Sequence, residues 1–155
     1  MKIAEFLSPQ AVIPDLSGKS KAEVLRELSL ALVHASPQLK AERLLEVLQE
    51  REKLGSTGIG EGVAIPHGKL AGLSQLQAAF GVSRSGVDFD AIDGRPTHLF
   101  FALVAPENSA GVHLKALARI SRLLRDPGMQ LRLRQERDRD AVYRMLTQKP
   151  ESHAA

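Results

Sequence analysis

The chain has 155 residues, of which 43% are hydrophobic and 25% charged, and its formal net charge is +3. This length fits one globular domain that can bury roughly two-thirds of the surface of its unfolded chain. The absence of cysteine excludes disulfides, thiolate metal sites and a thiol nucleophile, and it fits a reducing compartment. No window has the roughly eighteen apolar residues of a membrane span, and no signal peptide is recognised, so we expect a cytoplasmic protein without membrane insertion.

The basic charge is concentrated in the last third of the chain. Residues 113–155 contain ten Lys or Arg against five Asp or Glu, whereas residues 1–112 contain eleven against thirteen. A basic end can bind nucleic acid, but the arginines from Arg119 to Arg134 follow helical apolar patterns and have no aromatic residues between them. We therefore favour a solvated face or a protein-docking surface and expect no nucleic-acid partner.

Two amphipathic helices are predicted in the first third of the chain. Ser20 begins a segment with the spacing of a capping box, and apolar residues follow on one face to about His34. A second helix from about Lys40 to Lys53 carries Arg51 in its last turn. The apolar pieces in the first sixteen residues are too short to assign.

A glycine-rich segment follows, and it contains the residues with the most evident chemistry. Five of the chain's twelve glycines fall within residues 55–68, which suits a backbone that turns tightly or lets a ligand approach its amides. Ser56 and Thr57 lie in this bend. A proline favours an extended conformation before it, so Val63 to Ile65 are predicted as a short strand that ends beside His67. A neutral imidazole in such a place can act as a nucleophile.

The second half of the chain predicts two strands and then helices. Ala78 to Ser83 and Thr97 to Val104 read as strands, and the second is nearly all apolar and therefore central in a sheet. A helix begins near Val112 or His113, so His113 lies in a first turn, beside free backbone amides that suit an oxyanion. From the pattern alone, a buried histidine with a satisfied hydrogen bond is the simpler interpretation. The residues expected to face the core from this helix are Leu114, Leu117, Ile120, Ser121 and Leu124.

The remaining pattern completes the prediction of the fold. Residues 126–128, Asp-Pro-Gly, are expected to end that helix, and two shorter helices are predicted at about 130–135 and 140–148, before a tail at 149–155. The alternation of helices and strands predicts an α/β fold, an α/β/α sandwich in which a central mixed β-sheet is flanked by helices. The pattern does not establish the order of the strands.

The glycine-rich segment and later motifs resemble a known family. Residues 51–69 are similar to the active-site signature of the mannitol/fructose-class enzyme IIA domains (EIIA type 2) of the bacterial phosphoenolpyruvate-dependent phosphotransferase system. The resemblance continues through residues 89–94, 99–106, and His113 and Leu114 followed by Leu117. The resemblance spans most of residues 1–146 and is strongest to the free-standing nitrogen-regulatory members. We therefore expect one such domain over residues 1–148, with the fold predicted above.

The resemblance also implies roles for five residues. His67 would be the histidine that is transiently phosphorylated, at Nε2, and His113 the second active-site histidine. Arg51 would neutralise the phosphoryl group, and Ser56 and Thr57 would contact it. From composition alone, Arg51 would satisfy the last carbonyls of its helix and the hydroxyls would be ordinary turn residues. No metal and no cofactor are expected.

The implied function is that of a phosphocarrier regulatory protein of the nitrogen-related phosphotransferase system. It would accept a phosphoryl group from an HPr-like phosphocarrier protein of the nitrogen type and signal to regulatory target proteins through its phosphorylation state. The absence of an attached IIB domain and of a membrane segment favours this function over the first alternative, a sugar-transporting fructose/mannitol-type IIA subunit that passes phosphate to a IIB.

Other functions and two details are left open by the sequence. A second alternative is a non-catalytic anion- or protein-binding module of the same fold, whereas a metal-dependent hydrolase lacks the HxH or HExxH spacing for further ligands. Whether the chain counts as an enzyme and whether it forms a homodimer are not decided. Glu61 stands where the family commonly has a neutral residue, and we expect its carboxylate to face solvent.

Overall fold

The computed structural model describes residues 1–148, so the predicted tail at 149–155 lies outside the described residues. A mixed sheet forms its centre, with the strand order β1-β5-β6-β3-β2 and with β4 also paired to β6. The strands are β1 (Leu7–Ile13), β2 (Gly58–Gly60), β3 (Val63–Ala64), β4 (His67–Leu70), β5 (Gln77–Val87) and β6 (Thr97–Pro106).

Strand β6 lies at the centre of the sheet, as its apolar sequence predicts. It pairs antiparallel with β5 and parallel with both β3 and β4, while β1 runs parallel to β5 and β2 antiparallel to β3. All residues of β6 between Leu99 and Ala105 are buried. The strand β5 is longer than predicted, because its polar end continues the ladder beyond Ser83.

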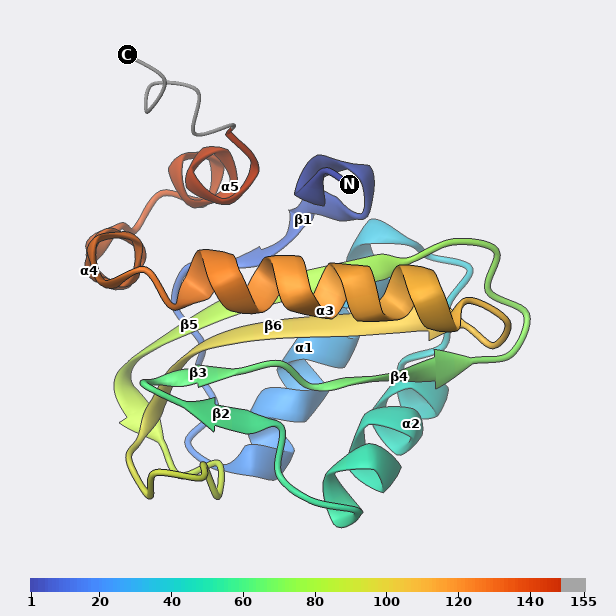
Figure 1. Cartoon of the computed structure of the whole chain (residues 1–155), viewed down its shortest axis with the longest axis horizontal. Helices are drawn as coiled ribbons and strands as arrows, with labels where there is room; N and C mark the ends of the chain where they lie inside the picture. The colour runs from blue at the N-terminus through green and yellow to red at the C-terminus, as the bar shows by residue number, and fades with distance from the viewer. Residues whose placement is uncertain (149–155) are drawn as a thin grey trace.

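Helices cover both faces of the sheet (Figure 1). Helices α1 (Lys21–Ala35) and α2 (Ala41–Lys53) lie on one face, and α3 (Ala110–Leu124) crosses the other. The short 3-10 helix η1 (Ile3–Glu5) precedes β1, and α4 (Pro127–Gln135) and α5 (Arg139–Thr147) follow α3. The predicted α/β/α sandwich around a mixed sheet is confirmed. None of the helices in residues 1–148 is long and apolar enough to cross a membrane.

The helix starts follow local capping chemistry. The Ser20 hydroxyl accepts a hydrogen bond from the Glu23 amide at 3.2 Å and caps α1 as predicted. The Asp126 carboxylate accepts the Met129 amide at 2.8 Å, so α4 begins at Pro127. The prediction that α4 starts near residue 130 was wrong, because a proline without an amide hydrogen suits the first turn of a helix.

Helix α3 packs on the sheet with a face different from the predicted one. Its buried residues are His113, Ala116, Ile120 and Leu124, whereas Leu114 is 67% exposed. The prediction that Leu114 faces the core was wrong, since each helical residue is rotated about 100° from the one before it. Leu117 and Ser121 lie at the margin of the buried face and are half-buried.

Strands β3 and β4 form one line along β6, interrupted only between them. Val63 lies opposite Leu99 and His67 opposite Leu103, which is the same register. Pro66 has no amide hydrogen to donate, but its carbonyl still accepts the Leu103 amide at 2.9 Å. The short strand predicted at Val63 to Ile65 is found as β3, and His67 begins a further strand, β4, that was not predicted.

Candidate functional site

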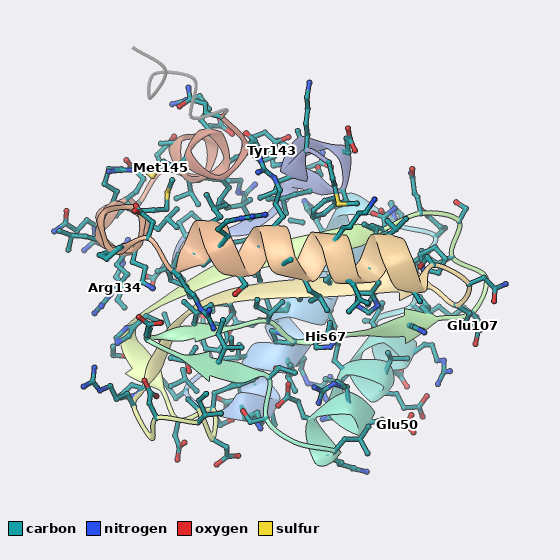
Figure 2. The ribbon with its side chains drawn as sticks, in the orientation of Figure 1. Glu50, His67, Glu107, Arg134, Tyr143 and Met145 are labelled. Atoms are coloured by element: carbon teal, nitrogen blue, oxygen red, sulfur yellow. The ribbon has the colours of Figure 1, made fainter. Side chains whose placement is uncertain are left out.

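The ring of His67 is held by its own backbone. Its Nδ1 lies 2.7 Å from the carbonyl oxygen of Ile65, and because a carbonyl can only accept, Nδ1 carries the hydrogen. Nε2 therefore carries the free lone pair. The ring is half-buried, between α2 and α3 in the view of Figure 2. The hydrogen bond fixes which nitrogen can act as a nucleophile.

A second imidazole, that of His113, stands next to this ring. The two ring centroids are 5.4 Å apart and the planes are nearly perpendicular, at 81°. His113 is only 7% exposed, and among residues 1–148 its Nε2 has no hydrogen-bond partner. A buried polar atom without a partner is costly, and an incoming acceptor beside His67 could satisfy it.

The sequence predicts free backbone amides beside His113 in the first turn of α3, but the amide of His113 itself is not free. The backbone amide of His113 already donates to the Ser109 carbonyl at 2.8 Å, because His113 is the fourth residue of the helix. Only the side chain of His113 is therefore available to bind a ligand at the site. The alternative of a fully satisfied buried histidine does not fit, because Nε2 is unpartnered.

Both histidines are biased towards the neutral form. Burial lowers the pKa of His67; the charge of Arg51 lowers it further, and the Ile65 hydrogen bond and the charge of Glu52 oppose the change. Burial also lowers the pKa of His113, helped by the charges of His67 and Lys69. Both shifts favour the uncharged ring, which is the state a nucleophilic imidazole needs.

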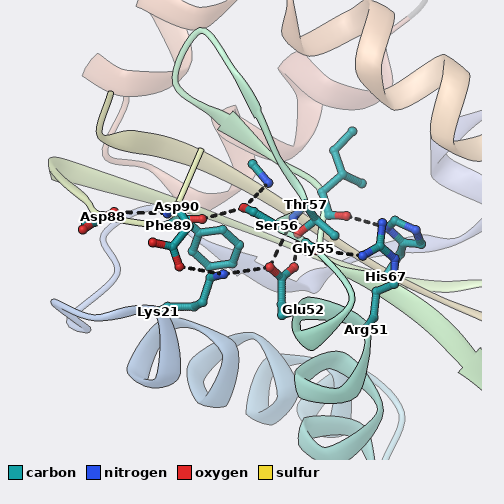
Figure 3. A network of polar contacts seen from close by, with 12 residues as sticks. Lys21, Arg51, Glu52, Gly55, Ser56, Thr57, His67, Asp88, Phe89 and Asp90 are labelled. Carbon is teal, nitrogen blue, oxygen red and sulfur yellow. Dashed lines mark hydrogen bonds and ion pairs between the residues drawn. The ribbon is translucent and has the colours of Figure 1, made fainter. Parts of the chain in front are cut away.

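Arg51 reaches the site from the last turn of α2. Its Nη1 donates to the carbonyl oxygen of Gly55 at 2.8 Å, so it binds the loop that follows the helix (Figure 3). Its guanidinium lies beside the ring of His67 in the same view, consistent with its charge lowering that pKa. The remaining donors of this group supply positive charge near an anion on Nε2.

The two hydroxyls of the glycine-rich loop are engaged inside the protein. The Ser56 hydroxyl donates to the Phe89 carbonyl at 2.6 Å and accepts the Gly58 amide at 2.9 Å. The Thr57 hydroxyl donates to Glu52, and Thr57 is only 4% exposed. A phosphoryl contact from Ser56 or Thr57 stays a prediction, and it requires these hydroxyls to leave their present partners.

Sequence reasoning missed the carboxylate that organises this loop. The side chain of Glu52 is 5% exposed, pairs with Lys21 Nζ at 3.0 Å and accepts the Thr57 amide at 3.2 Å. Lys21 also contacts Asp90 at 3.3 Å and lies over the Phe89 ring. The available signal was the acidic residue directly after Arg51 in the motif, but a glutamate in a last helical turn gave no reason to expect burial.

The acidic residue that departs from the family pattern does not reach His67. Glu61 adopts a φ of 56° in the turn between β2 and β3, and its carboxylate is exposed. Its Oε2 lies 4.0 Å from Arg125 Nε. The expectation that Glu61 faces solvent is confirmed.

The groups gathered at this site suit the binding of an anion. In the part of the chain that the structure describes, no group of three or more His, Cys, Asp or Glu could hold a metal ion. The neutral imidazole of His67, with its fixed lone pair, can act as a nucleophile, whereas the guanidinium of Arg51 can stabilise an anion directly.

Comparison with known proteins shows the family. Residues 5–149 match the family model described as "Phosphoenolpyruvate-dependent sugar phosphotransferase system, EIIA 2". Since this match covers most of the chain, the protein belongs to the EIIA type 2 family of the phosphotransferase system.

Within the family, the chain is similar to free-standing nitrogen regulatory proteins. It is 43% identical over 154 residues to the nitrogen regulatory protein of Bradyrhizobium diazoefficiens, which covers 99% of this chain and 100% of that protein. The crystal structure of the nitrogen regulatory protein IIA-Ntr from Neisseria meningitidis superposes with a TM-score of 0.86 at 38% identity, covering 94% of this chain and 99% of the other. A fructose-specific EIIABC component from Bacillus subtilis is 36% identical over 148 residues, 96% of this chain but 23% of that protein.

Proposed function

We propose that this protein is a phosphocarrier regulatory protein of the nitrogen-related phosphotransferase system. In this proposal, His67 accepts a phosphoryl group from a phosphohistidine on an HPr-like carrier protein of the nitrogen type. The observation that carries it is the fixed lone pair on His67 Nε2 next to the unpartnered ring of His113. The output is the phosphorylation state itself, read by regulatory target proteins.

The proposed step is a direct transfer between two nitrogens. The lone pair of His67 Nε2 forms a bond to phosphorus while the bond between phosphorus and the carrier's histidine nitrogen breaks, and that electron pair returns to the carrier's ring. The proton on His67 Nδ1 stays in place, where the Ile65 carbonyl stabilises the positive charge that the ring acquires. No metal or cofactor takes part in this step.

Two neighbours would stabilise the transferred group. His113 Nε2 has no partner in the described residues, and in the tautomer that carries the hydrogen on Nε2 it would donate to a phosphoryl oxygen. The guanidinium of Arg51 would neutralise part of the charge on the equatorial oxygens. Ser56 and Thr57 would join them only if their hydroxyls leave the partners described above.

A mixing experiment tests the acceptor. Carrier protein phosphorylated with labelled phosphate is added to the intact protein, and an acid-labile, base-stable label is expected on it. His67→Ala should take up no label, whereas His98→Ala should label normally, because His98 also bonds a carbonyl through Nδ1 but has no second imidazole described beside it. Label retained in His67→Ala would move the acceptor to another residue.

The fructose-specific relative supports a second candidate, a sugar-type IIA subunit that passes the phosphoryl group to a IIB protein. The nitrogen function is preferred because the similarity to the Bradyrhizobium protein is higher and covers that protein from end to end. The two are separated by incubating the labelled protein with a purified fructose-type IIB. Rapid loss of label to the IIB supports the sugar function, and retention supports the regulator.

A further inference from the structure

A continuous chain of contacts runs from helix α1 to the ring of His67. Lys21 Nζ lies 3.0 Å from Glu52, and Glu52 accepts both the amide and the hydroxyl of Thr57. The Thr57 carbonyl accepts the Ile65 amide at 3.0 Å, and the Ile65 carbonyl accepts His67 Nδ1 at 2.7 Å. Figure 3 shows the first part of this chain, where Glu52 lies between Lys21 and Thr57.

Glu52 is an unusual choice for a merely structural contact. Its side chain is 5% exposed, and burying a carboxylate is costly unless it is paired and hydrogen-bonded. Each of its oxygens has a partner from Thr57, and Lys21 offsets its charge. The carboxylate can therefore act as a fixed acceptor near His67 without leaving an uncompensated negative charge that would repel a phosphoryl group.

We propose that Glu52 is a positioning residue for His67. By holding Thr57 it fixes the peptide of Ile65, whose carbonyl keeps the hydrogen on His67 Nδ1 and leaves Nε2 free. This inference rests on the proposed function, because the choice of nitrogen affects the reaction only if Nε2 is the acceptor. The charge of Glu52 also opposes the lowering of the His67 pKa that burial causes.

The test uses Glu52→Gln with a matched control on the same helix. Glu46 also forms an ion pair, with Arg43 at 2.7 Å, but both side chains are more than half exposed and lie outside the chain of contacts. Glu46→Gln therefore removes a charge and an ion pair from α2 without touching Thr57. In Glu52→Gln, Lys21 keeps Asp90 as a partner, which limits the effect on folding.

Two measurements are made on each variant. Nitrogen NMR of the histidine rings in the free protein reports the tautomer, and Glu52→Gln should increase the share of His67 that carries the hydrogen on Nε2. Rapid-quench measurements of transfer from phosphorylated carrier should show that kcat of Glu52→Gln is lowered about tenfold, with KM for the carrier changed less than about twofold. Glu46→Gln should match the intact protein in both measurements.

The outcomes separate positioning from structure and from direct contact. A lower melting temperature with unchanged tautomer and unchanged kcat would overturn the inference, because Glu52 would then only stabilise the fold. If the Thr57 hydroxyl itself contacts the phosphoryl group, Glu52→Gln releases it and kcat is retained or raised, which also overturns the inference. If the intact protein accepts no phosphoryl group, the proposed function fails, while the tautomer of the free protein still decides whether Glu52 positions the ring.

Variants of Thr57 keep the inference testable if Glu52→Gln does not fold. Thr57→Val leaves the ion pair of Glu52 with Lys21 in place and removes only the hydroxyl. It should shift the His67 tautomer in the same direction, and Thr57→Ser should restore it. A slower transfer in Thr57→Val with an unchanged tautomer would contradict the inference.

Discussion

Two histidines of this protein are held in the same way but have different surroundings. His67 Nδ1 bonds the Ile65 carbonyl at 2.7 Å, and His98 Nδ1 bonds the Ser83 carbonyl at 2.9 Å; both residues are half-buried and lie in the sheet. The ring of His67 has a second imidazole beside it and the charge of Arg51 acting on it.

The surroundings of His98 contain different groups. It lines a hollow together with Glu61, Arg134 and neighbouring residues of the β2–β3 turn and α4. Figure 2 shows Arg134 at the left edge of the view, away from His67 near the centre. If His67 is the acceptor, as proposed, a fixed tautomer alone does not distinguish it from His98. The neighbouring groups decide whether the free nitrogen can be used.

The largest effect on the rate of transfer is expected when His113 is removed. His67 then loses its second imidazole, the group that distinguishes it from His98. His113→Ala should lower the rate of transfer to His67 about a hundredfold, the usual effect of losing one group that stabilises developing charge. The free energy of unfolding should change by less than about 1 kcal/mol, since lost packing is offset by the removal of an unpartnered buried nitrogen. Transfer kinetics and thermal unfolding measure both. Parallel losses of stability and activity would count against the assigned role.

A smaller effect is expected from Arg51. Arg51→Lys keeps the charge but loses the planar donors, and the rate of transfer should fall about tenfold because a lysine cannot bond the Gly55 carbonyl and a phosphoryl oxygen in the same geometry. Kinetics with phosphorylated carrier check this. Lys53→Arg, a basic exchange in the same turn of α2 at an exposed side chain, is the control. A rate of transfer equal to that of the intact protein would show that the guanidinium of Arg51 does not contribute to the reaction.

The glycine next to His67 gives a test of how closely α2 approaches the strand. A Cβ at Gly68 would lie 2.5 Å from Val47 Cγ1, so Gly68→Ala should destabilise the fold by about 1–3 kcal/mol through overpacking. Urea unfolding measures the change. The double variant Gly68→Ala with Val47→Ala removes the clash and should be more stable than the sum of the single changes predicts. Simple additivity would show that the two residues do not meet.

The smallest effect is expected in the dependence of stability on pH. The lowered pKa values of His67 and His113 mean that, below the ordinary histidine pKa of about 6.5, the unfolded chain binds protons that the folded chain does not. The free energy of unfolding should therefore fall as the pH drops from about 6.5 through the lowered pKa values. Above about pH 6.5, the two histidines should not change it. Urea unfolding at several pH values should show a flatter profile in the double variant His67→Ala with His113→Ala.

Local signals in the sequence predicted much of this fold. The Ser20 cap, the end of α2 at Lys53 and the apolar run of β6 all depend on neighbouring residues, and the structure agrees with each. The first sixteen residues could not be assigned, because β1 exists only through its pairing with β5, a distant partner in the sequence. Leu114 was misplaced because only packing on the sheet decides which of two overlapping apolar stripes is buried.

The candidate site also has features that the sequence predicted and features that it could not predict. The resemblance to the family predicted His67, His113 and Arg51, and the structure brings these three together. The partners of the hydroxyls could not be predicted, because Thr57 meets Glu52 only after the chain turns back on the end of α2. The isolated motif favours surface hydroxyls, whereas the folded chain uses them to support its own backbone.

The common register of β3 and β4 along β6 has a consequence for the reaction. Because the backbone is tied to β6 on both sides of Pro66, the peptide that carries His67 is immobilised when the protein folds. Little conformational entropy remains to be lost at this residue when a carrier docks. In the proposed function, His67 is therefore already in position before the carrier binds, and docking has only to align the two proteins.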